Sequence, residues 1–209
     1  MTTHASHPCR FVPGTTGWTE EDLDDPAIEP IWDGGGYEIV EGVLTRMPAA
    51  DLEGSLPLRR LVRQVERQLE QNNLPGEFAF EVDMVINRIR VPRVDAMFLT
   101  PAQLQQQAAI EAARKRRKGV KFGRLRVPPT LVVESLSLDH EDHDEITKRE
   151  WYRGFGIPHY WLLDPFRHSL ECLKLEQDEY KTNAAGRDSD AVTPSLFPEL
   201  TVQLAPIWM

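Results

Sequence analysis

The segment LVVESLS, residues 131–137, has the pattern of a strand buried in a protein core, yet Glu134 stands at its centre. Taking an ionised carboxylate out of water costs several kcal/mol even after the protein relaxes around it. Burying one neighbouring Leu or Val returns only about 1.5–3 kcal/mol. Glu134 therefore needs a cation, a bound proton, or an exposed strand edge where it stays hydrated.

Two more ionisable residues occupy similarly apolar surroundings. Asp95 lies within RVDAMFLT, a second strand-like run, and two such carboxylates could relieve each other through a shared cation or a shared proton. Lys148 is spaced on a helix with the aromatic residues between 151 and 155, so its side chain should face the core. The alternatives are a carboxylate satisfied by backbone amides at Asp95 and a surface ion pair of Lys148 with Asp144.

Glu41 and one basic segment add further candidates. Glu41, beside Gly42, could reach the same cation as a third acidic ligand, although a residue in a hairpin turn is as easily hydrated. The segment RKRRKGVKFGRLR, residues 114–126, holds eight of the 24 Lys and Arg residues and no acid, in a chain of net charge -9. Such a run is often a solvated surface, but here it is also the one basic concentration that could contact phosphates. The candidate residues are Arg114, Lys115, Arg116, Arg117, Lys118 and Lys121.

The elements that must position these side chains can be predicted from periodicity. Alternating runs predict hairpins over 37–47 and 77–100, strands at 131–137 and 159–165, and a closing hairpin arm from residue 169. Helical spacing of apolar residues predicts a helix ending near 72, one from Pro101 to Gly119, and one over 145–156. This order is neither a regular βαβ alternation nor an all-β ladder, so it predicts an α/β fold whose mixed sheet has helices on both faces.

The 209 residues, 41% of them hydrophobic, suffice for one well-buried domain. Residues 1–35, rich in Pro, Gly and acids, predict an irregular N-terminal arm, and residues 36–209 a single domain. No apolar run approaches the length that crosses a membrane, and the first residues lack a signal pattern, so we expect a cytoplasmic protein with no membrane partner.

The combined motifs resemble a known family. YEIVEG, RVDAMFL and the stretch TLVVESLS…DEITKREWYRGFGIPHYWLLDP are similar to the Uma-type family of "putative restriction endonucleases", within the PD-(D/E)xK nuclease superfamily, over residues 36 to 205. The resemblance implies a restriction-endonuclease-like core and Mg²⁺-dependent (or Mn²⁺-dependent) cleavage of DNA. It places the superfamily aspartate at Asp95 and the second acid at Glu134. The lysine that usually follows two positions later is replaced by Leu136, and the resemblance places it at Lys148.

These observations favour a DNA endonuclease in which Asp95 and Glu134 bind the metal, Lys148 assists the nucleophile and the basic segment contacts DNA. The alternative is a catalytically inactive binding or scaffold protein of the same fold, since Val94 and Leu138 replace prolines that the family shows. A hydrolase of small nucleotides is disfavoured because no Gly-rich phosphate loop is present. Cutting both strands of a duplex is most simply done by two symmetry-related sites, so a homodimer is expected.

Overall fold

The computed structural model describes residues 12–24, 36–47, 52–114, 123–137 and 143–209. The helices are η1 (Asp22–Asp24), α1 (Leu52–Gln71), α2 (Pro101–Ala113), η2 (His143–Lys148), α3 (Arg149–Phe155) and α4 (Ala205–Trp208). The strands are β1 (Gly36–Val40), β2 (Val43–Met47), β3 (Glu77–Asp83), β4 (Arg93–Leu99), β5 (Leu131–Ser135), β6 (His159–Asp164), β7 (Ser169–Glu176), β8 (Glu179–Arg187), β9 (Ala191–Val192) and β10 (Val202–Gln203).

Six strands form the central sheet in the order β3-β4-β5-β6-β7-β8. Strands β5 and β6 pair in parallel, and every other neighbouring pair in this sheet is antiparallel. The parallel pair is joined through η2 and α3, as a parallel connection requires a crossover. The mixed sheet predicted from the sequence is therefore confirmed, and the crossover delivers α3 onto one sheet face.

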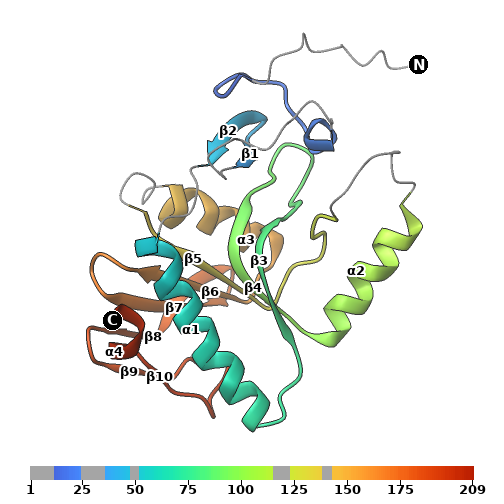
Figure 1. Cartoon of the computed structure of the whole chain (residues 1–209). Helices are drawn as coiled ribbons and strands as arrows, with labels where there is room; N and C mark the ends of the chain where they lie inside the picture. The colour runs from blue at the N-terminus through green and yellow to red at the C-terminus, as the bar shows by residue number, and fades with distance from the viewer. Residues whose placement is uncertain (1–11, 25–35, 48–51, 115–122, 138–142) are drawn as a thin grey trace, which may run out of the picture.

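Helices cover both faces of this sheet, also as predicted. One apolar cluster joins α1 and the C-terminal segment to residues such as Val133 and Trp161, and a second joins α3 to residues such as Val132 and Tyr160. Because alternate residues of a strand point to opposite faces, the two clusters lie on opposite sides of the sheet. Figure 1 shows α1 in front of the strands and the β1–β2 hairpin beyond one end of the sheet.

Local sequence explains the helix boundaries near the site. In α1 the apolar residues recur every three or four positions, and those between Leu58 and Leu69 are buried. Helix α2 begins with a reciprocal capping box, because the Thr100 side chain accepts from the Gln103 amide while Gln103 reaches back to Thr100. Helix α3 ends at Gly156, whose φ of 81° is in the left-handed region that glycine adopts without strain.

The structure revises one sequence expectation and adds detail in two other places. The helix predicted to run to Gly119 ends at Ala113, where Arg114 adopts an extended conformation. Within the predicted irregular arm, residues 12–24 hold a short helix, and Trp18 is buried in a small cluster with Ile39 and Leu44. The C-terminal elements β9, β10 and α4 were not predicted. In the parts of the chain that the structure describes, no helix is long and apolar enough to span a membrane.

Candidate active site

Glu134 is fully buried in β5, and two side chains of the crossover contact its carboxylate. The Tyr152 hydroxyl donates a hydrogen bond of 2.5 Å to Glu134 Oε1, and Lys148 Nζ lies 3.4 Å from the same oxygen. The Glu134 side chain is 0% exposed and that of Lys148 is 2% exposed. Of the three states considered for Glu134, this environment favours the ionised carboxylate stabilised by a cation, because an ammonium and a hydroxyl donor both stabilise the charge.

The crossover places both partners by helical spacing. Lys148 ends η2 and Tyr152 lies four residues later in α3, so the two side chains occupy one helix face. Tyr152 is itself held by an edge-to-face contact with Tyr160 of β6, at 5.2 Å between ring centroids. The expectation that Lys148 faces inward with its aromatic neighbours is confirmed, since both Lys148 and Tyr152 are buried.

Asp95 lies on β4 beside Glu134 and on the same face of the sheet. The β4–β5 ladder pairs Ala96 with Val133, and continuing this antiparallel register by one residue sets Asp95 opposite Glu134. Opposed residues of an antiparallel pair share a face. The Ser135 amide donates a hydrogen bond of 2.8 Å to Asp95 Oδ2, which fixes the aspartate against the end of β5. The structure thus brings together the two predicted carboxylates and Lys148.

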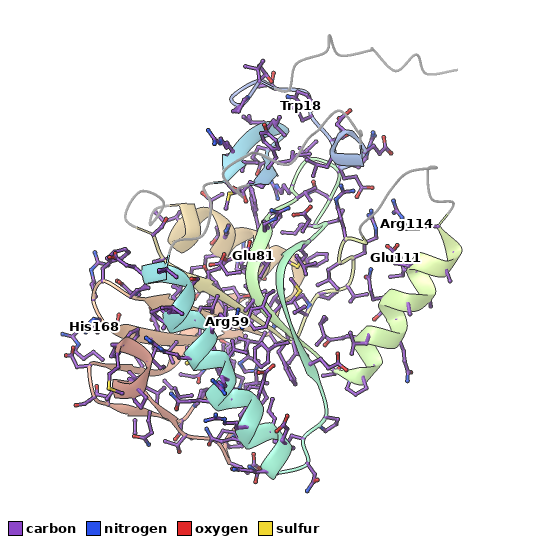
Figure 2. All side chains as sticks on the ribbon, in the orientation of Figure 1. Trp18, Arg59, Glu81, Glu111, Arg114 and His168 are labelled. Atoms are coloured by element: carbon purple, nitrogen blue, oxygen red, sulfur yellow. The ribbon has the colours of Figure 1, made fainter. Side chains whose placement is uncertain are left out.

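A third carboxylate, Glu81, extends this row and was missed at the sequence level. The β3–β4 ladder pairs Phe80 with Ala96 and Val82 with Val94, which sets Glu81 opposite Asp95. Figure 2 labels Glu81 on β3. Its φ of 53° is left-handed, an unusual backbone conformation for a glutamate within a strand. The alternation of residue types along a strand predicts which side chains share a face, but it does not indicate that one residue adopts a left-handed backbone conformation.

The charges around Glu81 connect it to the same site. Although the residue is exposed as a whole, partial desolvation raises the pKa of its carboxyl, and the nearby Asp95 charge raises that pKa further. The Arg93 and Lys148 cations act in the opposite direction and lower it. Asp95 and Lys148 therefore lie within electrostatic range of Glu81. Carboxylates from the three neighbouring strands β3, β4 and β5 thus lie close to one another.

Glu41 contacts a different set of partners. It occupies the β1–β2 turn with a φ of 51°, and Arg90 Nε lies 2.7 Å from its Oε1. The Trp151 indole also donates a hydrogen bond of 3.2 Å to that oxygen, and the Arg90 guanidinium lies 5.8 Å from the centroid of the Trp151 ring. Glu41 thus joins the β1–β2 turn, the loop between β3 and β4, and α3. Its predicted role as a metal ligand stays a prediction.

Only one of the predicted DNA-contacting residues is in a described part of the chain. Arg114 follows α2, and its Nη2 lies 3.8 Å from Glu20 Oε1. Arg126 approaches the other oxygen of Glu20 at 2.6 Å, so this acid of the N-terminal arm engages both arginines. Figure 2 labels Arg114 beside Glu111 of α2. The remaining predicted residues, Lys115, Arg116, Arg117, Lys118 and Lys121, lie outside the described residues.

The donors gathered here suit a hard divalent cation. Carboxylate oxygens are the preferred protein ligands of Mg²⁺, which commonly uses one or two of them and completes its shell with water and substrate phosphate oxygens. Asp95 and Glu134, opposed on one face, meet that requirement. Among the described residues, no three His, Cys, Asp or Glu side chains stand close enough to hold an ion by themselves. The chemistry therefore fits a site that is completed by water and substrate.

Comparisons with known proteins bear on the family and the fold of the chain. Residues 28–205 match the sequence profile of Uma2, whose description is "Putative restriction endonuclease". A solved structure described as a "putative nuclease belonging to DUF820" from Anabaena variabilis is similar over 83% of this chain and 89% of that chain, with a TM-score of 0.62 and 16% identity. At this identity the likeness shows that the two chains share a fold. No curated protein matches the chain.

Proposed function

Because the chain belongs to the Uma2 family, whose profile covers residues 28–205, we propose that it is a metal-dependent endonuclease that hydrolyses phosphodiester bonds in DNA. The observation that carries this proposal is the buried Glu134 of β5, opposed to Asp95 and contacted by Lys148 and Tyr152. A carboxylate pair with an ammonium at its side provides the functional groups that phosphoryl transfer requires.

Each residue would have a separate task. Asp95 and Glu134 would hold Mg²⁺ or Mn²⁺, and Glu81 on β3 would add negative charge near the ion and accept hydrogen bonds from the waters that complete its shell. When bound, the metal supplies Lewis-acid polarisation of a phosphate oxygen and activation of water. Lys148 offsets negative charge that develops on the nucleophile and on the phosphorus centre. Tyr152, through its hydrogen bond to Oε1, orients the Glu134 carboxylate.

Two parts of the proposal concern the substrate and the assembly. Residues 114–121 would contact DNA phosphates, with Arg114 released from, or shared with, its ion pair to Glu20. A two-fold dimer would place two sites on the two strands of a duplex. The dimer is tested by sedimentation at micromolar concentration, where a monomer with full cleavage of both strands would contradict it.

One observation favours the alternative of an inactive binding or scaffold protein. The buried Glu134–Lys148 pair has a structural reason to persist, because removing one partner leaves an uncompensated charge in the core. A protein that had lost catalysis would therefore keep both residues. A substitution at Asp95 distinguishes the two functions. Its side chain is only half-buried, so neutralising it should destabilise the fold less than neutralising the fully buried Glu134.

The test compares cleavage of supercoiled plasmid by the wild type and by Asp95→Asn. Asparagine can still accept the Ser135 hydrogen bond through its side-chain oxygen, so the fold should survive. We expect cleavage with Mg²⁺ or Mn²⁺ to fall at least about 100-fold, with weaker Mn²⁺ binding by calorimetry. Glu77→Gln, an exposed change on β3, is the matched control and should cleave normally.

Two outcomes would overturn the endonuclease proposal. The first is a wild type that leaves plasmid intact with both metals, which would favour the scaffold function. The second is an Asp95→Asn variant that is folded, as judged by thermal unfolding, and cleaves at the wild-type rate.

A further inference from the structure

Arg93 is a half-buried cation close to the candidate active site. It begins β4 and precedes Asp95 by two residues, or about 7 Å along the strand. The Arg93 side chain is 28% exposed, so solvent reaches part of it. Arg93 is thus a cation on the same strand as one of the site carboxylates, and it is open to a ligand from solution.

The Glu81 carboxyl identifies Arg93 as part of the same group of charges. Desolvation and then the Asp95 charge raise the pKa of this carboxyl. The Arg93 cation lowers that pKa, and its effect is larger than that of Lys148. Because Coulomb interactions weaken with distance, Arg93 and Lys148 both lie near Glu81. Two cations, one on β4 and one on the crossover between β5 and β6, therefore lie near the carboxylates.

Two contacts hold the Arg93 guanidinium in place. Its Nε donates a hydrogen bond of 2.9 Å to Oδ1 of Asp83, the residue opposite Arg93 in the β3–β4 pair. The far end of the guanidinium lies against Gly36 of β1, where a Cβ atom would overlap Nη1. Glycine at this position thus leaves room for the guanidinium. Because the guanidinium is a rigid planar fork, these contacts also fix the direction of its terminal nitrogens.

The terminal nitrogens of Arg93 remain available to a ligand. Among the residues that the structure describes, neither Nη1 nor Nη2 of Arg93 donates a hydrogen bond to a protein group. Asp83 Oδ2 also lies 3.6 Å from Arg124 Nε, so one carboxylate serves two guanidinium groups. A fixed cation with two unused donor groups suits an anion that presents two oxygens, as a phosphate does.

We propose that Arg93 is a catalytic residue that binds the non-bridging oxygens of the phosphate hydrolysed at the Asp95–Glu134 site, an inference that rests on the proposed nuclease function. Hydrolysis adds the oxygen and one hydrogen of water to phosphorus, and the other hydrogen to the departing sugar oxygen. During this transfer, negative charge is spread over the phosphate oxygens that neither enter nor leave. Arg93 from β4 and Lys148 from the crossover together offset that charge.

The experiment measures single-turnover cleavage of supercoiled plasmid with Mg²⁺, and Mn²⁺ binding by calorimetry in parallel. The test variant is Arg93→Gln, and thermal unfolding checks that it folds. Asp83→Asn breaks the same ion pair but retains the guanidinium. Gly36→Ala leaves every charge in place, while its methyl group displaces the guanidinium. The matched control, Arg187→Gln, removes one charge from β8, at the other edge of the sheet from β3.

Arg93→Gln should slow cleavage by about 10–100-fold, because the transition state loses hydrogen bonds from a charged donor. Its Mn²⁺ affinity should equal or exceed that of the wild type, since a cation is removed from near the carboxylates. Asp83→Asn should lose clearly less activity than Arg93→Gln. Gly36→Ala should also cleave more slowly, with unchanged Mn²⁺ binding, and Arg187→Gln should cleave at the wild-type rate.

Three results would overturn the inference: cleavage by Arg93→Gln at the rate of the control, an equal loss in Asp83→Asn, or weaker Mn²⁺ binding by Arg93→Gln. The second result would assign the effect to the ion pair, and the third would assign it to the metal site. If Arg93→Gln does not fold, wild-type cleavage by Gly36→Ala overturns the inference instead. A wild type that cleaves with no effect of Arg93 refutes the role of Arg93 alone, whereas a wild type that leaves plasmid intact refutes the nuclease proposal and this inference with it.

Discussion

Removing Lys148 should destabilise the protein far more than removing an exposed lysine. In Lys148→Met the Glu134 carboxylate stays fully buried with Tyr152 as its remaining contact among those described above. Breaking a buried ion pair by deleting one partner costs about 3–5 kcal/mol, because an uncompensated charge remains in the core. For a chain of this size, one kcal/mol shifts the melting temperature by about 2–4 °C, so we expect a loss of roughly 6–20 °C.

A double-mutant cycle isolates the interaction itself. Glu134→Gln keeps an oxygen that can accept from Tyr152, and it should alone cost a similar amount because it removes the carboxylate charge 3.4 Å from the buried Lys148 ammonium. The double variant buries no net charge and should cost clearly less than the sum of the single variants, with a coupling of about 2 kcal/mol or more.

The assay is urea unfolding at pH 7, with Lys174→Met as the control. Lys174 Nζ lies 3.1 Å from Glu176 Oε1, but about two fifths of each side chain is exposed, so this pair should contribute less than about 1 kcal/mol. A Lys148→Met variant that loses no more stability than this control, or single-variant costs that simply add, would refute the assignment of a buried ionised pair.

Three further predictions concern neighbouring side chains. Tyr152→Phe should cost about 1.5–3 kcal/mol, measured by urea unfolding, because Glu134 loses a charged hydrogen bond; an unchanged midpoint would contradict this. Burial and then Lys174 lower the pKa of His159 from 6.5 to about 4, so the unfolded state binds more protons between these values and stability should fall as pH drops from 6.5 towards 4. His159→Gln should flatten that pH dependence, and an equally steep acid profile would count against it. Glu81→Gly should raise stability by about 1 kcal/mol by relieving a left-handed backbone, while it weakens Mn²⁺ binding in calorimetry; lower stability would show that the backbone is not strained.

Much of the site was predictable because its charged residues stand within otherwise apolar segments. Glu134 and Asp95 are charged residues within apolar strands, and Lys148 follows the periodicity of a buried helix face. A buried charge of this kind requires a polar or charged partner, and the structure shows such partners for all three residues. The mixed character of the sheet was also predictable, because hairpins pair strands antiparallel whereas the helix between β5 and β6 allows them to pair in parallel.

Other features depend on long-range contacts that periodicity does not contain. The early end of α2 coincides with the ion pairs of Arg114 and Arg126 to Glu20, a residue more than 90 positions away. Glu81 lies beside Asp95 and has a left-handed backbone conformation, whereas its sequence context is that of an ordinary strand residue. The docked position of Trp18 likewise depends on a cluster formed by the β1–β2 hairpin.

The shared burial of Glu134 and Lys148 also constrains how relatives of this chain can diverge. Loss of either residue alone leaves a charge in the core, so the two positions should change together during evolution, through replacements that restore neutrality. Asp95 is half-buried and accepts a hydrogen bond from the Ser135 amide, which an asparagine oxygen can also accept, so this position can change to asparagine with its backbone contact preserved. Lineages that abandon cleavage should therefore first lose the acid on β4, and retain the buried pair long afterwards as an inherited part of the fold.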